Sequence, residues 1–173
     1  MEIRPHADAL EIAELDPFLA ELLRQIPEST QAGSNVDAEK RLFSQPSDAS
    51  NSELCAEWKL YVEPELRRLF QTATGTVAAD LAQLNGNSKP FANSTLRIPA
   101  AHAEAWLSAL NQARLVIAAK YAFTDGELGD HYRSPIGSRR DLSLFQVNFY
   151  GVLQEFILQH LIDGSREQRS NED

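Results

Sequence analysis

The sequence predicts a mainly α-helical protein, a single-domain bundle of four to five helices with at most one small two-stranded antiparallel element. Several long stretches repeat apolar residues every three to four positions, which is the period of an amphipathic helix. The apolar-polar alternation that is typical of a strand is confined to residues 10–12 and 96–98. With 173 residues and a hydrophobic content of 43%, the chain is long enough to bury the core of one domain.

The two strand-like stretches share a pattern, Leu10-x-Ile12 and Leu96-x-Ile98, and each one leads into a helix-like segment. Short strands need backbone partners, so we expect residues 10–12 to pair with residues 96–98 in an antiparallel ribbon. The match is only three residues long, and coincidence is the alternative interpretation.

The first helix is expected to begin after Asp16, whose carboxylate suits an N-cap, with Pro17 in the first helical position. Pro27 is expected to end this helix. Residues 27–50 are rich in Ser, Gln, Asn and Pro and predict a mobile connection that holds one short helical turn near residues 37–43.

The next helical region follows Asn51 and Ser52, either of which can cap it, and continues to residue 84. Pro64 predicts either a kink or a fresh start. Gly75 is unfavourable inside a helix and is a candidate bend. The pair Arg67 and Arg68 is interpreted as a solvated helix face, with a partner-facing role as the alternative.

The helix expected to begin at Pro99 and to run to Tyr121 carries the clearest buried face. Its apolar stripe contains Trp106, Leu110 and Ile117, and Trp106 is expected to anchor the core. Arg114 lies in the same stripe. Because an unpaired buried guanidinium is very costly, we expect it to pair with a carboxylate from another helix. The candidate partners are Glu57, Asp80 and Glu155.

The last helix is expected to begin at Asp141 and to be apolar on more than one face. One structural stripe contains Phe145, Phe149, Val152 and Phe156, and another face carries Leu144, Val147, Leu158 and Ile162. We expect this helix at the centre of the bundle, with a homodimer interface as the alternative. Residues 1–164 then form the domain, and residues 165–173 are expected to be a disordered tail.

Composition excludes several classes of function. The net charge of -9 argues against a nucleic-acid-binding protein, which needs a basic surface. Cys55 is the single cysteine, so neither an internal disulfide nor a thiolate zinc cluster is expected. No apolar leader or membrane-length segment is apparent, so we expect a cytoplasmic protein without membrane association.

The richest polar cluster is the long loop over residues 124–140. Asp125, Asp130 and His131 offer oxygen and nitrogen ligands to a metal, but their spacing does not match the calcium-binding loop. A solvated loop is therefore the preferred interpretation, and a metal-binding or metal-dependent enzymatic site is the alternative. No catalytic set and no cofactor-binding motif is recognised, so the expected protein is not an enzyme.

Residues 96–120 read LRIPAAHAEAWLSALNQARLVIAAK and, with the upstream YVEPELRRLF and the last apolar helix, carry a family likeness. They resemble an uncharacterised bacterial family, common in actinobacteria, described as a domain of unknown function. The shared helix reads W-L-x-A-L-N-x-x-R-L-V, here from Trp106 to Val116. Its members are often encoded beside ClpS, an adaptor of the Clp protease, so the resemblance implies a link to regulated proteolysis and no catalytic residues.

These observations together predict a non-catalytic, cytoplasmic protein-interaction or regulatory module. Its expected partner is a protein, and the resemblance makes the Clp system the candidate.

Overall fold

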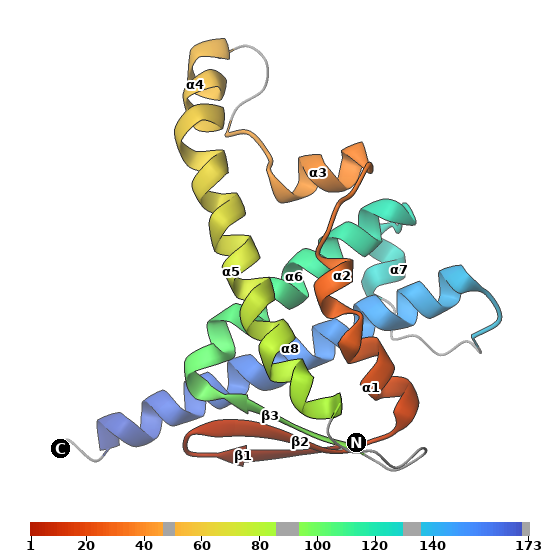
Figure 1. Cartoon of the computed structure of the whole chain (residues 1–173), viewed down its shortest axis with the longest axis vertical. Coiled ribbons are helices and arrows are strands. Elements are labelled where there is room, and N and C mark those ends of the chain that lie inside the picture. Colours follow the sequence, from red (N-terminus) through yellow and green to blue (C-terminus); the bar gives the residue numbers. More distant parts are fainter. Residues whose placement is uncertain (47–50, 86–93, 130–135, 171–173) are drawn as a thin grey trace.

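The computed structural model describes residues 1–46, 51–85, 94–129 and 136–170, with side chains described as far as Ile162 apart from that of Asn85. A three-stranded sheet lies at one end of the molecule, and the helices gather on one side of it (Figure 1). The prediction of a mainly helical fold with a small antiparallel element is confirmed. The predicted number of strands, two, was wrong, because the sheet has three.

The sheet is formed by β1 (Glu2–His6), β2 (Ala9–Leu15) and β3 (Ser94–Pro99), all antiparallel, with β2 in the middle. β2 and β3 pair as predicted, with Leu10 opposite Ile98 and Ile12 opposite Leu96. β1 escaped prediction because it contains one core-directed apolar residue, Ile3, among polar ones. Its Pro5 is tolerated because β1 is an edge strand, where a missing N–H breaks no ladder.

Two short helices follow the sheet. α1 (Pro17–Arg24) begins as predicted, with the Leu19 backbone N–H donating to Asp16 Oδ1 over 2.9 Å. Pro27 does not end the helical path but lies in the first turn of α2 (Ile26–Ser29), where its missing N–H is not needed. α3 (Val36–Leu42) is the short helix expected within residues 27–50.

The next segment is one continuous helical path in three parts. α4 (Ser52–Glu57) is capped by Asn51, and a π-helical segment (Trp58–Val62) joins it to α5 (Glu63–Leu81). Pro64 lies in the first turn of α5, and its ring disfavours the ordinary α-helical approach of the Leu60 carbonyl, so a wider turn occurs here. α5 continues through Gly75 without interruption, contrary to the expected bend.

α6 (Ala103–Lys120) is the central helix, since it contacts α2, α3, α5 and α8. The expectation that the last helix holds the centre is therefore wrong. α6 is rich in alanine, which lets four neighbours approach its backbone closely. Its small and apolar side chains are buried on most faces, including Ala109, Leu110, Ala113, Val116 and Ile117.

α8 (Arg139–Ser170) begins two residues earlier than expected, because the Ser138 hydroxyl accepts the Asp141 backbone N–H. It also extends to Ser170, into the segment expected to be a disordered tail. Residues such as Arg, Glu and Gln favour helix, and extending an existing helix costs little. The short α7 (Asp125–Gly129) precedes it. Of the helices in the described ranges, none has both the length and the apolarity needed to cross a bilayer.

Candidate functional site

A hollow between four segments is a candidate for a ligand site. It has a volume of about 680 Å³, within the range of small-molecule sites. One face of α5 forms a long wall, the connection from α2 to α3 and the end of α3 face it, and Gln112 of α6 contributes from the body. The lining residues of α5 recur at helical spacing: Arg67, Phe70, Gln71, Thr74, Gly75 and Ala78. We call this hollow the cavity.

Arg67 is neutralised at the mouth of the cavity. Its guanidinium donates to the carboxylates of Glu39 on α3 and Glu63 on α5, and it lies over the Phe43 ring at 3.8 Å from the centroid. The hydrogen bond with Glu39 and that with Glu63 raise the pKa of Arg67 above its usual value. The interpretation of Arg67 as part of a plain solvated face is thus replaced by a structural role, since it joins α3 to α5.

The second candidate is an exposed apolar surface. Residues 51–69, which we call the arm, comprise α4, the π-helical segment and the first turns of α5, and they extend away from the sheet end of the molecule (Figure 1). Their exposed large apolar side chains are Leu54, Leu60, Tyr61, Val62 and Leu69. Leu60 is 64% and Tyr61 71% exposed, and no residue of the π-helical segment is buried.

The end of α5 meets the start of α6 in a polar cluster that is buried at Asp80 and Trp106. The Trp106 indole N–H donates to Asp80 Oδ2 over 2.9 Å, and His102 Nδ1 lies 3.0 Å from both carboxylate oxygens. Trp106 is fully buried and the Asp80 side chain is 6% exposed. This cluster ties α5 to the start of α6, because Asp80 binds both His102 and Trp106, and this geometry fits a structural role.

Arg114 has a different partner from the one expected. Its Nη1 donates to Gln154 Oε1 over 2.6 Å, so the hydrogen-bond acceptor is a neutral amide and none of the three candidate carboxylates. The guanidinium packs against Gly151 of α8, where a Cβ would lie 3.4 Å from it. Burial lowers the pKa of Arg114, and the charge of Glu155, one of the candidates, opposes this shift.

The buried apolar face of α8 coincides only in part with the predicted stripe. Val147, Tyr150, Leu153 and Ile157 face the core, whereas Val152 and Phe156 are 42% and 40% exposed. The face turned inward is set by contact with α6, which the sequence of α8 alone does not specify. Of the predicted structural residues, Trp106, Leu110, Ile117 and Phe149 are buried, while Phe145 is partly buried against the core.

Leu158 and Ile162 are also exposed, so the second half of α8 presents an apolar strip, whereas Val147 is buried and Leu144 packs on the core. A second copy of the chain covering this strip stays a prediction. Light scattering at several concentrations tests it.

The loop predicted as an alternative metal site is only partly described. Asp125 is exposed on α7, whereas Asp130 and His131 lie outside the described residues. Glu127 accepts hydrogen bonds from Arg140 and from the backbone and hydroxyl of Thr124, which together lower its pKa to about 2. No group of three or more His, Cys, Asp or Glu within the described ranges is placed to share a metal ion.

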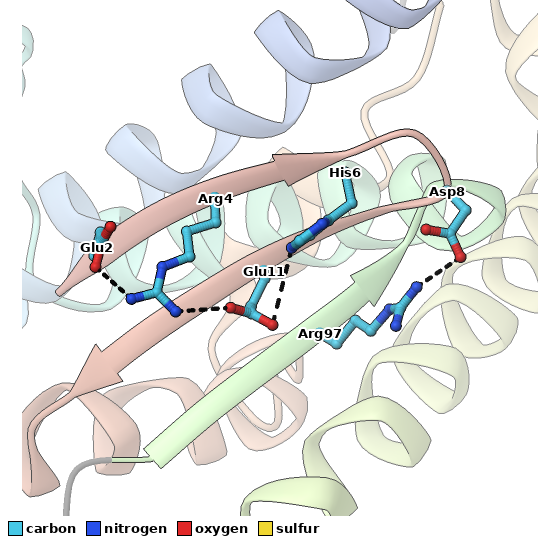
Figure 2. A network of polar contacts seen from close by, with 6 residues as sticks. All are labelled: Glu2, Arg4, His6, Asp8, Glu11 and Arg97. Carbon is cyan, nitrogen blue, oxygen red and sulfur yellow. Dashed lines mark hydrogen bonds and ion pairs between the residues drawn. The ribbon is translucent and has the colours of Figure 1, made fainter.

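The outer face of the sheet is a polar surface (Figure 2). Arg4 of β1 bridges Glu2 and Glu11, His6 Nε2 lies 3.9 Å from Glu11 Oε2, and Arg97 of β3 pairs with Asp8 over 2.6 Å. Arg4 lowers the pKa of the Glu2 carboxyl. These exposed pairs have little energetic weight, and they keep this face hydrophilic while its opposite face packs on the helices.

The cavity was missed from the sequence because its lining comes from four segments that only the fold brings together. A signal did exist in α5, where residues at helical spacing decrease in size from Arg67 to Ala78. The arm was missed because Leu54, Tyr61 and Leu69 fit the ordinary pattern of a buried helix face.

Comparison with known families gives a match over most of the chain. The family model described as "Domain of unknown function (DUF2017)" matches residues 3–161, and the chain belongs to this family. The expected membership in an uncharacterised family is confirmed. A search of curated proteins and a search of solved structures both find no match.

Proposed function

We propose that this protein is a non-catalytic interaction module that docks a partner protein through the arm. The observation that carries the proposal is the exposure of Leu60, Tyr61 and their neighbours on a helix that extends from the body. Apolar surface in water is unfavourable, and contiguous exposed apolar side chains mark interaction sites on soluble proteins.

The spacing of these side chains supports a helix-in-groove mode of binding. Leu54, Trp58, Tyr61 and Val62 recur at intervals of three to four residues, as the anchors of an amphipathic helix do in a partner groove. A π-helical segment is energetically less favourable than an α-helix and often occurs at functional sites. Here it contains the most exposed of the apolar side chains.

The charges around the arm define the partner's chemistry. Glu53 and Glu57 are exposed beside Leu54, Lys59 is exposed beside Leu60, and the whole chain carries a net charge of -9. Arg67 and Arg68 are already bound to carboxylates of this protein. The complementary surface is therefore an apolar groove with a basic rim, because like charges at an interface rim repel.

We further propose that this protein is cytoplasmic and that its partner belongs to the system of Clp-dependent proteolysis. Its support is the family likeness over Trp106 to Val116 and the neighbourhood of ClpS that this likeness implies. The metal-dependent alternative keeps Asp125, Asp130 and His131 as its candidate ligands. Metal analysis of the purified protein tests it independently of the arm.

The experiment measures binding of the purified protein to purified ClpS by titration calorimetry. The variant Leu60→Ser removes an apolar anchor from the arm, and Val36→Ser on α3 is the matched control because both side chains are 64% exposed. We expect wild type and Val36→Ser to bind equally and Leu60→Ser to bind at least tenfold more weakly. No binding of the wild type would remove the Clp assignment, and equal binding of all three would remove the arm.

A further inference from the structure

Docking through the arm does not account for the composition of the cavity lining. The apolar contribution comes from Phe43 and Phe70, whose ring centroids are 5.7 Å apart and tilted by 38°, together with Leu42, Ala32 and Ala78. Aromatic side chains attract a flat ring through stacked or edge-to-face contacts. These walls therefore suit a planar ring better than a flexible chain.

The most buried polar side chain of the cavity lining is the amide of Gln112. Gln112 lines the cavity although it is 3% exposed, and its Nε2 donates one hydrogen to Ser108 Oγ over 3.1 Å. Among the described residues, no donor is placed on its Oε1. This oxygen is therefore free to accept a hydrogen bond, and an amide presents an acceptor and a donor side by side. A ligand edge with the same pair of groups can bind both.

The charges exclude an anion. The only cationic side chain of the described lining is Arg67, and it is held by both Glu39 and Glu63. The remaining polar lining is neutral: Thr30, Gln31, Gln71, Thr74 and Gln112. A phosphate or carboxylate would meet Glu39 and, in the described lining, no positive charge that is not already paired, so the ligand is uncharged or weakly cationic.

Gly75 indicates that the space is retained. A glycine inside a 19-residue helix weakens that helix. A Cβ added at Gly75 would meet nothing within 4 Å, so neither close packing nor an unusual backbone angle requires glycine here. Gly75 nevertheless lines the cavity between Thr74 and Ala78, where any larger side chain would occupy the hollow.

We infer that the cavity binds an uncharged planar ring with an adjacent hydrogen-bond donor and acceptor, the amide-like edge found in nucleobases and in nicotinamide. The ring packs against the wall that Phe43 and Phe70 form together, and its polar edge meets Gln112. The small residues of α5 provide the room. This site shares only Arg67 with the arm, and it does not depend on the proposed docking function.

The test is titration of the isotope-labelled full chain with adenosine, uridine, nicotinamide and adenosine monophosphate, followed by amide chemical shifts. We expect one of the three uncharged probes to saturate, with the largest shifts at residues 74, 75 and 112. Adenosine and uridine distinguish a purine ligand from a pyrimidine ligand. Nicotinamide distinguishes a cofactor ring from both nucleobases. The phosphate should weaken adenosine binding at least threefold.

Two variants and one control variant keep the test specific. Gly75→Leu should fill the cavity and weaken binding at least tenfold without lowering the unfolding midpoint, and Gly126→Leu on α7, which also faces open space, is the matched control with unchanged binding. Gln112→Leu removes the amide and should weaken binding by a similar factor. The inference is overturned if none of the uncharged probes saturates at millimolar concentration, if Gly75→Leu binds as wild type does, or if the monophosphate binds more tightly.

Discussion

The two tryptophans of the chain lie in contrasting environments. Trp106 of α6 is fully buried, and its indole N–H donates to a carboxylate that is itself buried. Trp58 lies in the π-helical segment of the arm, half-buried among exposed neighbours. Both belong to helices with similar apolar spacing, so the difference comes from the surroundings: α6 has neighbours on several sides, while the arm extends from the body.

This contrast separates stability from recognition. Side chains that are buried on folding stabilise the native state in proportion to the apolar area removed from water. Side chains that stay exposed contribute little until a partner covers them. We therefore expect substitutions in the body to lower the free energy of unfolding and substitutions in the arm to change binding.

The largest effect is expected from Trp106→Ala. Removing this indole leaves a void between α5 and α6 and leaves Asp80 without one of its donors, so the free energy of unfolding should fall by about 3 to 5 kcal/mol. Trp58→Ala should cost less than about 1 kcal/mol. Urea unfolding of both variants measures the difference. Equal losses would remove the distinction between the body and the arm.

A smaller loss is expected from Tyr150→Phe. The Tyr150 hydroxyl donates to the Leu22 carbonyl over 2.6 Å and accepts from Gln146 Nε2, so its removal leaves buried groups unpaired and should cost about 1 to 3 kcal/mol. Burial raises the pKa of this phenol above its ordinary value near 10. Its contribution is therefore complete below pH 10 and is lost as the pH rises further, because only the unfolded state ionises readily.

Measurement of unfolding from pH 8 to 11 checks both parts of this prediction. The stability difference between wild type and Tyr150→Phe should be constant up to about pH 10 and then shrink. A difference that grows above pH 10 contradicts the assignment of a buried, protonated phenol.

Gly75→Ala should have the opposite sign. Alanine is a better helix former, and the added methyl group meets nothing within 4 Å, so the variant should be more stable by about 0.5 to 1 kcal/mol. Thermal unfolding monitored by circular dichroism measures this gain. A loss of stability would show that a packing constraint, and not the open cavity, accounts for the glycine.

The smallest effect is expected at Glu127, whose side chain is one-third exposed. Its bonds to Arg140 and Thr124 hold the pKa at about 2, below the ordinary value of 4.5. The stabilisation from these bonds is therefore present above pH 4.5 and is lost as the pH falls toward 2. Relative to wild type, Glu127→Gln should have a lower unfolding midpoint at pH 7, with a gap that closes in acid. A gap independent of pH would contradict the assignment.

Local signals of the chain predicted much of the fold. Asp16 and Asn51 cap helices as expected, and the pairing of Leu10 with Ile98 follows from matching alternation. These features depend on neighbours within a few residues or on a short repeated pattern. β1 was missed because an edge strand with one apolar residue has no such pattern.

Features that depend on tertiary contact were not predictable. The orientation of α8, the neutral partner of Arg114 and the central position of α6 result from helix packing. The cavity joins segments separated by up to 82 positions in the chain, from Thr30 to Gln112. An apolar helix face also has the same sequence pattern whether it packs on a core or binds a partner. The exposure of Leu60 could therefore be seen only in the structure.

The most direct test of the arm as a docking surface is site-specific photo-crosslinking in the native cell. A photoreactive side chain replaces Leu60 in one variant and Val36 in another, since the two positions are equally exposed. The account predicts that one partner protein is crosslinked from position 60 and not from position 36. In purified form, this partner should bind wild type and Val36→Ser equally well and should bind Leu60→Ser at least tenfold more weakly. No adduct from position 60, or the same adducts from both positions, would contradict it.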